Sequence, residues 1–150
     1  SNKAVNTLPV KSGKTKVRDR FFNYIILNHK GSTAIQKRTE KDIWINLFEF
    51  PNIETTSMLS EDEFLQSKQW KMFIGNNTYN IKKISSPTKH ILSHQRIYAR
   101  FWEIESKKPI HTFLPENTLV ISSEKLHEYA VPRLIDKYLQ AQKKNVADLK

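Results

Sequence analysis

In this 150-residue sequence, the stretch most informative about the fold is Trp44-Ile45-Asn46-Leu47-Phe48-Glu49-Phe50-Pro51. Its aromatic and β-branched residues favour a buried strand over 44–50, which Pro51 and Asn52 end. Working outward, residues 21–27 form a continuous run of the same residue types and predict another buried strand. Turn residues at 28–31 then allow 32–38 to return as its partner strand.

Beyond Pro51 the sequence predicts alternating helices and strands. Ser60 and Glu63 have the spacing of a capping box, which predicts a helix over 61–70. A last helix is expected from Pro132, with one apolar stripe facing a sheet. We expect the fold class to be α/β or α+β, a mixed sheet with two or three helices. Further strands are expected at 81–84, 89–92, 95–104 and 118–121. The apolar stripe of the last helix comprises Leu134, Ile135, Tyr138 and Leu139.

Composition excludes several classes of protein. Lys and Arg number 25 against 15 Asp and Glu, and this net charge of +10 favours a polyanionic partner, nucleic acid first. A hydrophobic content of 38% is too high for a disordered basic tail. The absence of cysteine excludes disulfides, thiolate metal sites and a Cys nucleophile. No apolar run is long enough for a membrane helix, so we expect a cytoplasmic protein.

The chain divides into three expected regions. Residues 1–19 are expected to be a basic interdomain linker, or a segment derived from an expression tag, and 20–142 a folded domain. Residues 143–150 are expected to be a polar tail, with fraying beyond Gln140. Lys14, Lys16 and Arg18 in the first region are candidates for phosphate contacts. A solvated tail is the alternative.

Catalytic and metal-binding patterns are weak. The five histidines form no ligand pair on an expected helix, which argues against a metal site. Ser93 and His94 are adjacent, so on a strand they would point to opposite faces and make a poor nucleophile–base pair. Glu61, Asp62 and Glu63 are consecutive and would fan around a helix instead of clustering for a metal. We expect no catalytic residue and no metal in this chain.

Several segments in this order resemble the C-terminal domain of the MutY family of A/G-specific adenine DNA glycosylases. Residues 44–51 are similar to the family's Trp-x-x-Leu-Trp-Glu-Phe-Pro segment, and 90–94 (His-Ile-Leu-Ser-His) resemble its His-x-Phe-Ser-His loop. Residues 129–135 resemble its closing helix with Ala-x-Pro at the start, and 14–20 its interdomain linker. The resemblance spans 8–140 and implies a Nudix-like fold without the catalytic glutamate helix.

The resemblance also implies a role for the loop. In the family this loop inspects 8-oxoguanine opposite adenine, so Ser93 and His94 are expected to contact the lesion. A Ser hydroxyl can accept a hydrogen bond from N7–H, which guanine lacks. Leu92 stands where the family has Phe and is expected to act as an apolar wedge. Gln95 and His90 are further DNA-binding candidates; Lys82, Lys83, Lys89 and Arg96, expected to bracket the loop, are phosphate-contacting candidates.

The function implied is that of a monomeric lesion-recognition domain in base excision repair. The resemblance implies duplex DNA containing 8-oxoguanine:A pairs and the parent's N-terminal catalytic domain as partners. We expect a bacterial cytoplasmic location, with association with the nucleoid through DNA binding. That missing domain would carry an iron–sulfur cluster, while this chain would hold no cofactor.

Other interpretations stay open. Ser93 and His94 can also be interpreted as a plain hairpin turn, and the lysines as a solvated surface. A general nucleic-acid or protein-interaction module on a degenerate Nudix fold is one alternative function. A nucleotide pyrophosphohydrolase is another, which the missing glutamate motif disfavours.

Overall fold

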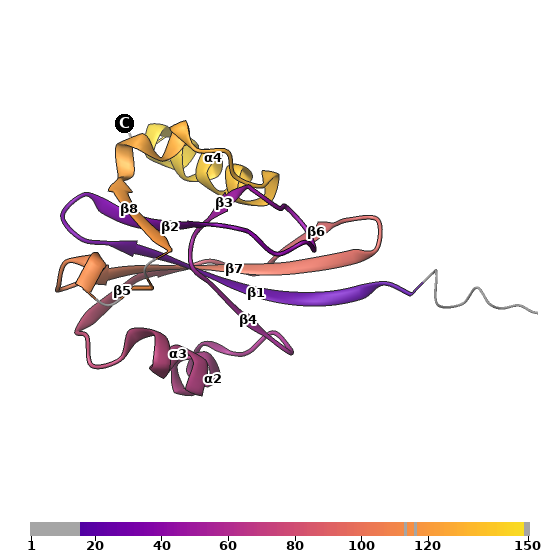
Figure 1. The fold of residues 1–150 in the computed structure, drawn as a ribbon, viewed down its shortest axis with the longest axis horizontal. Helices are drawn as coiled ribbons and strands as arrows, with labels where there is room; N and C mark the ends of the chain where they lie inside the picture. Colours follow the sequence, from indigo (N-terminus) through magenta and orange to yellow (C-terminus); the bar gives the residue numbers. More distant parts are fainter. Residues whose placement is uncertain (1–15, 113, 116, 149–150) are drawn as a thin grey trace, which may run out of the picture.

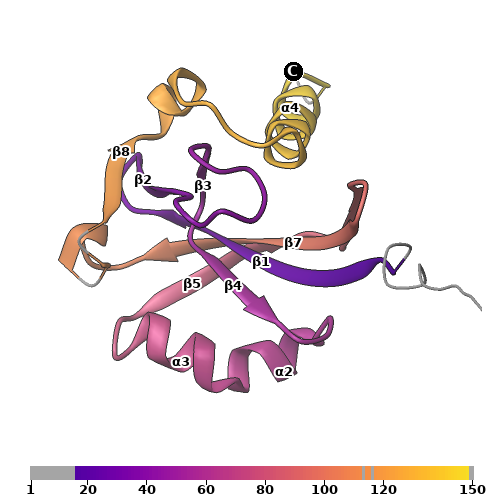
Figure 2. The ribbon, with the colours of Figure 1, turned by 45° about the vertical axis from the view of Figure 1, so that its right-hand side comes forward.

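The computed structural model describes residues 16–112, 114–115 and 117–148. Its elements form layers, with a mixed sheet between helices (Figures 1 and 2). Helix α4 (Arg133–Asp148) covers one face of the sheet, and helices α2 (Glu61–Gln66) and α3 (Lys68–Ile74) cover the other. Two short 3₁₀ helices, η2 (Ile110–Thr112) and η3 (Ser123–Glu128), lie in the connections. The expected α+β class with a mixed sheet is confirmed.

Two long parallel strands form the centre of the larger sheet. They are β1 (Arg18–Asn28) and β7 (Gln95–Ser106). β4 (Asn52–Thr55) pairs antiparallel with the outer side of β1. On the other side of β7, β5 (Tyr79–Ile84) pairs with its last residues and β6 (Thr88–Ile91) with its first. The strands expected over 21–27, 81–84, 89–92 and 95–104 are thereby confirmed.

Both faces of β1 and β7 are buried along most of their length, which explains their nearly continuous apolar sequences. Phe22, Tyr24 and Phe101 pack on one face with Leu134 and Ile135 of α4. Trp102, Ile25, Phe64 and Trp70 pack on the other face beneath α2 and α3. Trp70, Trp102 and Phe101 are almost completely buried core residues.

A second, three-stranded sheet departs from the expected pairing. β2 (Ser32–Lys37) lies between β3 (Phe48–Glu49) and β8 (Thr118–Ser122), all antiparallel. The sequence predicts that β2 pairs with β1, but the two share only the bridge between His29 and Ser32 at their turn. β7 pairs along the whole of one edge of β1 and β4 takes Phe21–Tyr24 on the other, so a long β1–β2 ladder is blocked and β2 turns away into its own sheet.

The strand expected over 44–50 is wrong for its first half, because only Phe48–Glu49 is a strand. Trp44 and Asn46 adopt positive φ angles of 55° and 69°. The segment closes on itself through hydrogen bonds from Asn46 N–H to Arg38 O (2.7 Å) and from Leu47 N–H to Trp44 O (3.1 Å). This turn folds Trp44 back onto Phe22, with ring centroids 6.2 Å apart. Core packing thus overrides the local strand preference.

The helix expected over 61–70 is two helices. The capping box at Ser60 and Glu63 is present and starts α2. Ser67 then adopts an extended conformation, ends α2, and accepts a hydrogen bond from Trp70 N–H to start α3. The break turns both Phe64 and Trp70 into one core, with ring centroids 5.6 Å apart.

Helix α4 begins next to Pro132, as expected, and buries Leu134 and Ile135. It continues to Asp148, so the expected fraying after Gln140 is wrong. At the other end of the chain, Arg18 and Asp19, expected in a linker, belong to β1 and pair with Gln95 and Arg96. Within the described residues, no helix has both the length and the hydrophobicity needed to span a membrane.

Candidate nucleic-acid interface

The loop singled out by the sequence is the tip of the hairpin between β6 and β7, here called the β6–β7 hairpin. Leu92 N–H donates to Gln95 O at 2.8 Å, which leaves Ser93 and His94 at the turn, both exposed. Arg18 N–H donates to His94 O at 3.1 Å, so the first residue of β1 supports the turn. The structure therefore places the predicted pair in a tight turn, at the end of the sheet where β1 begins (Figure 1).

The two faces of β6 differ in their surroundings. Lys89 points to the α2–α3 side, where its ammonium lies 5.9 Å from the Tyr98 ring centroid. His90, on the opposite face, meets Trp44 edge-on with ring centroids 6.0 Å apart. Burial lowers the pKa of His90, and the positive charges of Lys137 and Arg133 on α4 lower it further. His90 is thus a half-buried residue of the hairpin, and its lowered pKa favours the neutral imidazole.

The predicted wedge residue Leu92 is half-buried and packs against the core cluster beneath α4. It lies next to the exposed tip but faces inward. In the free protein Leu92 therefore anchors the hairpin, while Ser93 and His94 are exposed at its tip.

An ionic cluster lies beneath the hairpin. Arg20 of β1 donates two hydrogen bonds to the Glu54 carboxylate (2.7 and 2.9 Å) and one to Asp42 (2.9 Å). The same guanidinium lies 3.3 Å from the side-chain carbonyl of Gln95. Gln95, a predicted DNA-binding residue, therefore contacts the protein interior. The cluster comprises Arg20, Arg38, Asp42, Glu49 and Glu54.

Arg38 joins the second half of this cluster. It bonds both Asp42 oxygens and, at 3.0 Å, the buried carboxylate of Glu49. Burial raises the pKa of Glu49, partly offset by hydrogen bonds from Gln36 and Arg38. Burial also opposes ionisation of Asp42, but hydrogen bonds from Arg20, the Ile43 backbone and Arg38 outweigh it and lower the pKa of Asp42 to about 2. The cluster fixes the 38–47 turn against β1.

The phosphate-contacting candidates do not all lie at the hairpin. Arg96 does, but its guanidinium pairs with the Asp19 carboxylate at 2.6 Å. Lys83 lies opposite Glu103, seven residues along β7 from Arg96, or about 23 Å at 3.3 Å per residue. Lys82 pairs with Glu105 at 3.7 Å, farther still. The expectation that Lys82 and Lys83 bracket the loop is wrong, because β5 pairs with the opposite end of β7.

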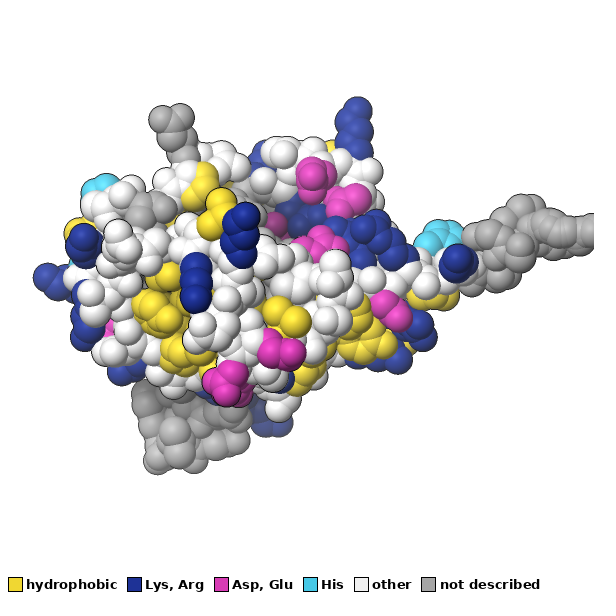
Figure 3. Space-filling model, turned by 90° about the horizontal axis from the view of Figure 1, so that it is seen from below, with side chains coloured by type: hydrophobic (Ala, Val, Ile, Leu, Met, Phe, Trp, Pro, Cys, Tyr) yellow, Lys and Arg dark blue, Asp and Glu magenta, His cyan; other side chains and the backbone are white. Residues whose placement is uncertain are grey.

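Arg18, Lys16 and Lys89 are exposed near the tip, whereas Lys14 lies outside the described residues. Figure 3 shows Lys and Arg side chains intermixed with Asp and Glu and with hydrophobic groups at the end of the molecule where β1 begins. The exposed Ile91 contributes to the apolar part of this surface, with 68% of its area accessible. The surface therefore combines cations, an apolar side chain and the Ser93–His94 tip.

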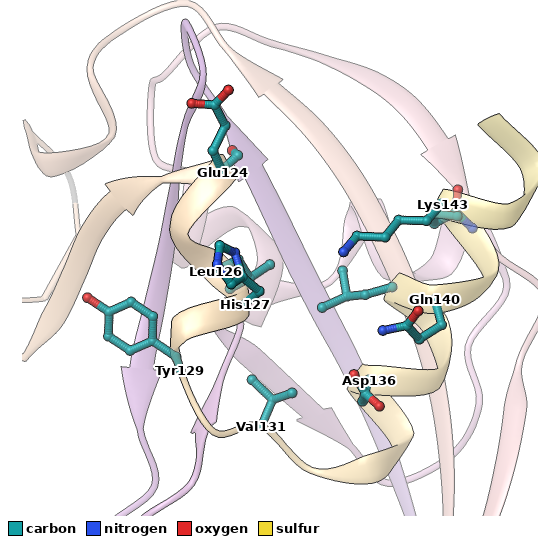
Figure 4. Close-up of a pocket in the computed structure, with 11 residues that line it drawn as sticks. Glu124, Leu126, His127, Tyr129, Val131, Asp136, Gln140 and Lys143 are labelled. Atoms are coloured by element: carbon teal, nitrogen blue, oxygen red, sulfur yellow. The ribbon is translucent and has the colours of Figure 1, made fainter. Parts of the chain in front are cut away.

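A separate pocket of about 450 Å³ lies between η3 and α4. Figure 4 shows Leu126 and His127 on one wall and Asp136, Gln140 and Lys143 on the other. None of these residues is a candidate from the sequence, because their clustering depends on how η3 and α4 meet. The pocket is distinct from the β6–β7 hairpin.

Comparison with known protein families matches the NUDIX domain over residues 23–141. The chain belongs to the Nudix family. No curated protein matches its sequence.

Solved structures confirm the Nudix-like fold. The C-terminal domain of mouse MUTYH, solved in complex with human PCNA, aligns with a TM-score of 0.64 at 14% identity, over 87% of this chain and 91% of that one. MutT from Methanosarcina mazei Go1 aligns with a TM-score of 0.58 at 12% identity, over 86% and 96%. RenU, a Nudix hydrolase from M. smegmatis, aligns with a TM-score of 0.57 at 7% identity, over 89% of this chain and 88% of that one. At these identities the likeness shows the fold alone.

In this Nudix domain, no group of three or more His, Asp or Glu side chains within the described residues is arranged to hold a metal ion. In the acidic first turn of α2, the Glu63 carboxylate caps the helix, because it accepts a hydrogen bond from Ser60 N–H at 2.8 Å. That hydrogen bond lowers the pKa of Glu63.

Several residues around the Nudix domain's hairpin escaped the sequence analysis. Arg20 ends the basic segment that resembles a linker, Arg38 ends an expected strand, and Arg133 and Lys137 look like the polar side of a helix. Only the tertiary fold joins Arg20 to Gln95 and to the cluster of Arg38, and brings the charges of Arg133 and Lys137 close enough to lower the pKa of His90.

Proposed function

We propose that this Nudix domain binds duplex DNA and recognises 8-oxoguanine opposite a mispaired adenine, while a separate catalytic domain removes the adenine. The observation that carries the proposal is the β6–β7 hairpin, which presents Ser93 and His94 to solvent at its tip. The flanking Leu92 packs against the core and Gln95 contacts Arg20, so the tip is held on both sides.

The chemistry of the tip suits the lesion. 8-Oxoguanine carries a hydrogen-bond donor at N7 and an acceptor at C8, where guanine has an acceptor at N7 and no oxygen at C8. The Ser93 hydroxyl can accept from N7–H, and a backbone N–H can donate to the C8 oxygen. Guanine has no oxygen at C8 to accept from the backbone N–H, and the hydroxyl can bond its N7 only by turning its O–H to donate; one lost contact of this kind corresponds to about 1–3 kcal/mol of discrimination.

Two further observations support the proposal. The overall fold aligns with the C-terminal domain of mouse MUTYH over most of both chains. The net charge of +10 favours a polyanion, and Arg18 and Lys89 are exposed beside the tip.

The proposal is tested by titrating the domain with short duplexes containing 8-oxoguanine:A or G:A at one fixed salt concentration, followed by amide chemical shifts. We expect the largest shifts over residues 90–96, greater for the lesion duplex. In Ser93→Ala the difference between duplexes should fall, while Ser86→Ala, an exposed serine outside the hairpin, should behave as the wild type.

Equal shifts for both duplexes, spread over the basic surface, would contradict lesion recognition and favour a general nucleic-acid module. Absence of binding to either duplex would contradict both functions.

A further inference from the structure

The start of α4 is fixed next to the β6–β7 hairpin by packing. Phe48 N–H donates to Ala130 O at 2.8 Å, which joins the segment before α4 to β3. Ile135 and Asp136 N–H both donate to Pro132 O at 3.0 Å, and Leu134 and Ile135 are buried. This packing therefore fixes the rotation of α4 about its own axis, and so determines the direction in which its polar residues point.

In that setting Arg133 and Lys137 are exposed one turn apart. Like charges at this spacing repel each other and destabilise a helix by several tenths of a kcal/mol. Within the described residues neither side chain makes an ion pair. Asp136, the acidic residue between them, lines the η3–α4 pocket instead (Figure 4). The pair is thus an uncompensated patch of positive charge.

This patch faces the hairpin. On the hairpin, His90 contacts Trp44, and both Trp44 and Leu92 pack against the core cluster that contains Leu134 of α4. The positive charges of Lys137 and Arg133 also lower the pKa of His90. An anion bound by Arg133 and Lys137 would therefore lie along the α4 flank of the hairpin. Lys89 and Arg18 provide cations elsewhere around the hairpin, since Lys89 points to the α2–α3 side and Arg18 supports the turn.

We propose that Arg133 and Lys137 bind backbone phosphates of the DNA strand whose base meets Ser93 and His94. This inference rests on the proposed function and extends it, because it assigns α4 as a second contact surface. The strand would cross the tip of the hairpin, with its phosphates held by α4 on one flank. Phosphate contacts set register and orientation on the duplex and carry no sequence information themselves.

The test compares Arg133→Gln/Lys137→Gln with the wild-type chain in binding to both duplexes across a range of salt concentrations. Removing two phosphate-binding cations should weaken binding to the 8-oxoguanine and G duplexes by the same factor. The slope of log K against log salt should become shallower by about 2, or about 1 for each cation replaced. Ser93→Ala should leave that slope unchanged while it reduces the preference for the lesion.

The matched control is Lys68→Gln/Lys71→Gln, which removes two exposed charges from α3 on the opposite face of the sheet. A smaller effect of this control is expected. If the wild-type chain binds in a way that depends on Ser93, but the α4 and α3 variants have the same slope of log K against log salt, the α4 contact is overturned. The proposed function would still stand in that case. No binding by the wild-type chain would overturn both.

Discussion

The side-chain carbonyl of Gln95 lies 3.3 Å from a guanidinium nitrogen of Arg20. Gln95 is the residue that follows the Ser93–His94 tip, and Arg20 belongs to the ionic cluster beneath it. Through this contact the exposed tip is joined to Asp42 and Glu54, residues of two other segments of the chain. The hairpin is therefore positioned by the body of the domain, which limits the freedom that an isolated turn would have.

Replacing Arg20 should destabilise the fold and loosen the hairpin. The Arg20 side chain is only 7% exposed, and Arg20→Gln would remove both hydrogen bonds from Arg20 to the Glu54 carboxylate and the one to Asp42, which would keep Arg38 as its cationic partner. We expect a loss of about 3 kcal/mol in the free energy of unfolding, measured by urea denaturation. Hydrogen exchange at Leu92 N–H should also become faster.

The control for this prediction is Arg96→Gln, which breaks the exposed ion pair with Asp19 on the same two strands. Exposed pairs contribute little, so this variant should unfold close to the wild type. Equal destabilisation by the two variants would contradict the assigned role of the ionic cluster.

The cluster also predicts acid sensitivity. Hydrogen bonds from Arg20 and Arg38 hold the pKa of Asp42 at about 2 in the folded state, below the ordinary value of 3.8. A carboxyl with a lowered folded-state pKa contributes stability above its unfolded pKa and loses it as the pH falls. Asp42→Asn should therefore reduce stability by up to about 2 kcal/mol at pH 7. The difference from the wild type should shrink between about pH 4 and pH 2, as followed by thermal unfolding at each pH. A difference that is constant with pH would contradict ionisation of Asp42 as the cause.

Most of the fold is predictable because its strands are strongly apolar. The long apolar runs of β1 and β7 are sufficient to predict buried strands, and the capping box of Ser60 and Glu63 predicts the start of α2. The turn at Trp44 is not predictable, since its residues have high strand propensity and only contacts with Phe22 and His90 fold it back. The pairing of β2 with β3 and β8 likewise depends on which neighbours have already occupied β1.

The site divides in the same way. A local motif identifies Ser93 and His94, and the structure places them in an exposed turn. Lys82 and Lys83 are near the motif in sequence but far from it along β7, because β5 and β6 pair with opposite ends of one strand. Arg133 is distant in sequence, and only the packing of α4 brings its charge close enough to lower the pKa of His90.

His90 should report the charge on α4 in the free protein. Burial lowers its pKa first, and Lys137 and Arg133 add to the effect. Arg133→Gln/Lys137→Gln removes the repulsion and leaves the burial, so the His90 pKa should rise towards its ordinary value of 6.5 without reaching it. An NMR titration of the imidazole protons measures this directly. Lys143→Gln, on the pocket side of α4, should leave the His90 pKa unchanged. An unchanged pKa in the double variant would show that the two cations do not face His90.

Nudix-type nucleotide hydrolysis is expected to be absent from this chain. Such hydrolysis needs several carboxylates on one face of a helix to hold divalent metal, and the acidic residues of α2, Glu61, Asp62 and Glu63, are consecutive. The Glu63 carboxylate also accepts a hydrogen bond from Ser60 N–H. A substitution of Glu63 would therefore disrupt the capping box of α2, so it is not a clean test of metal binding. Incubation with Mg²⁺ and 8-oxo-dGTP should release no pyrophosphate above a protein-free control. Turnover that depends on Mg²⁺ and is abolished by Glu61→Gln, with the fold intact by circular dichroism, would overturn this prediction and assign α2 a catalytic role.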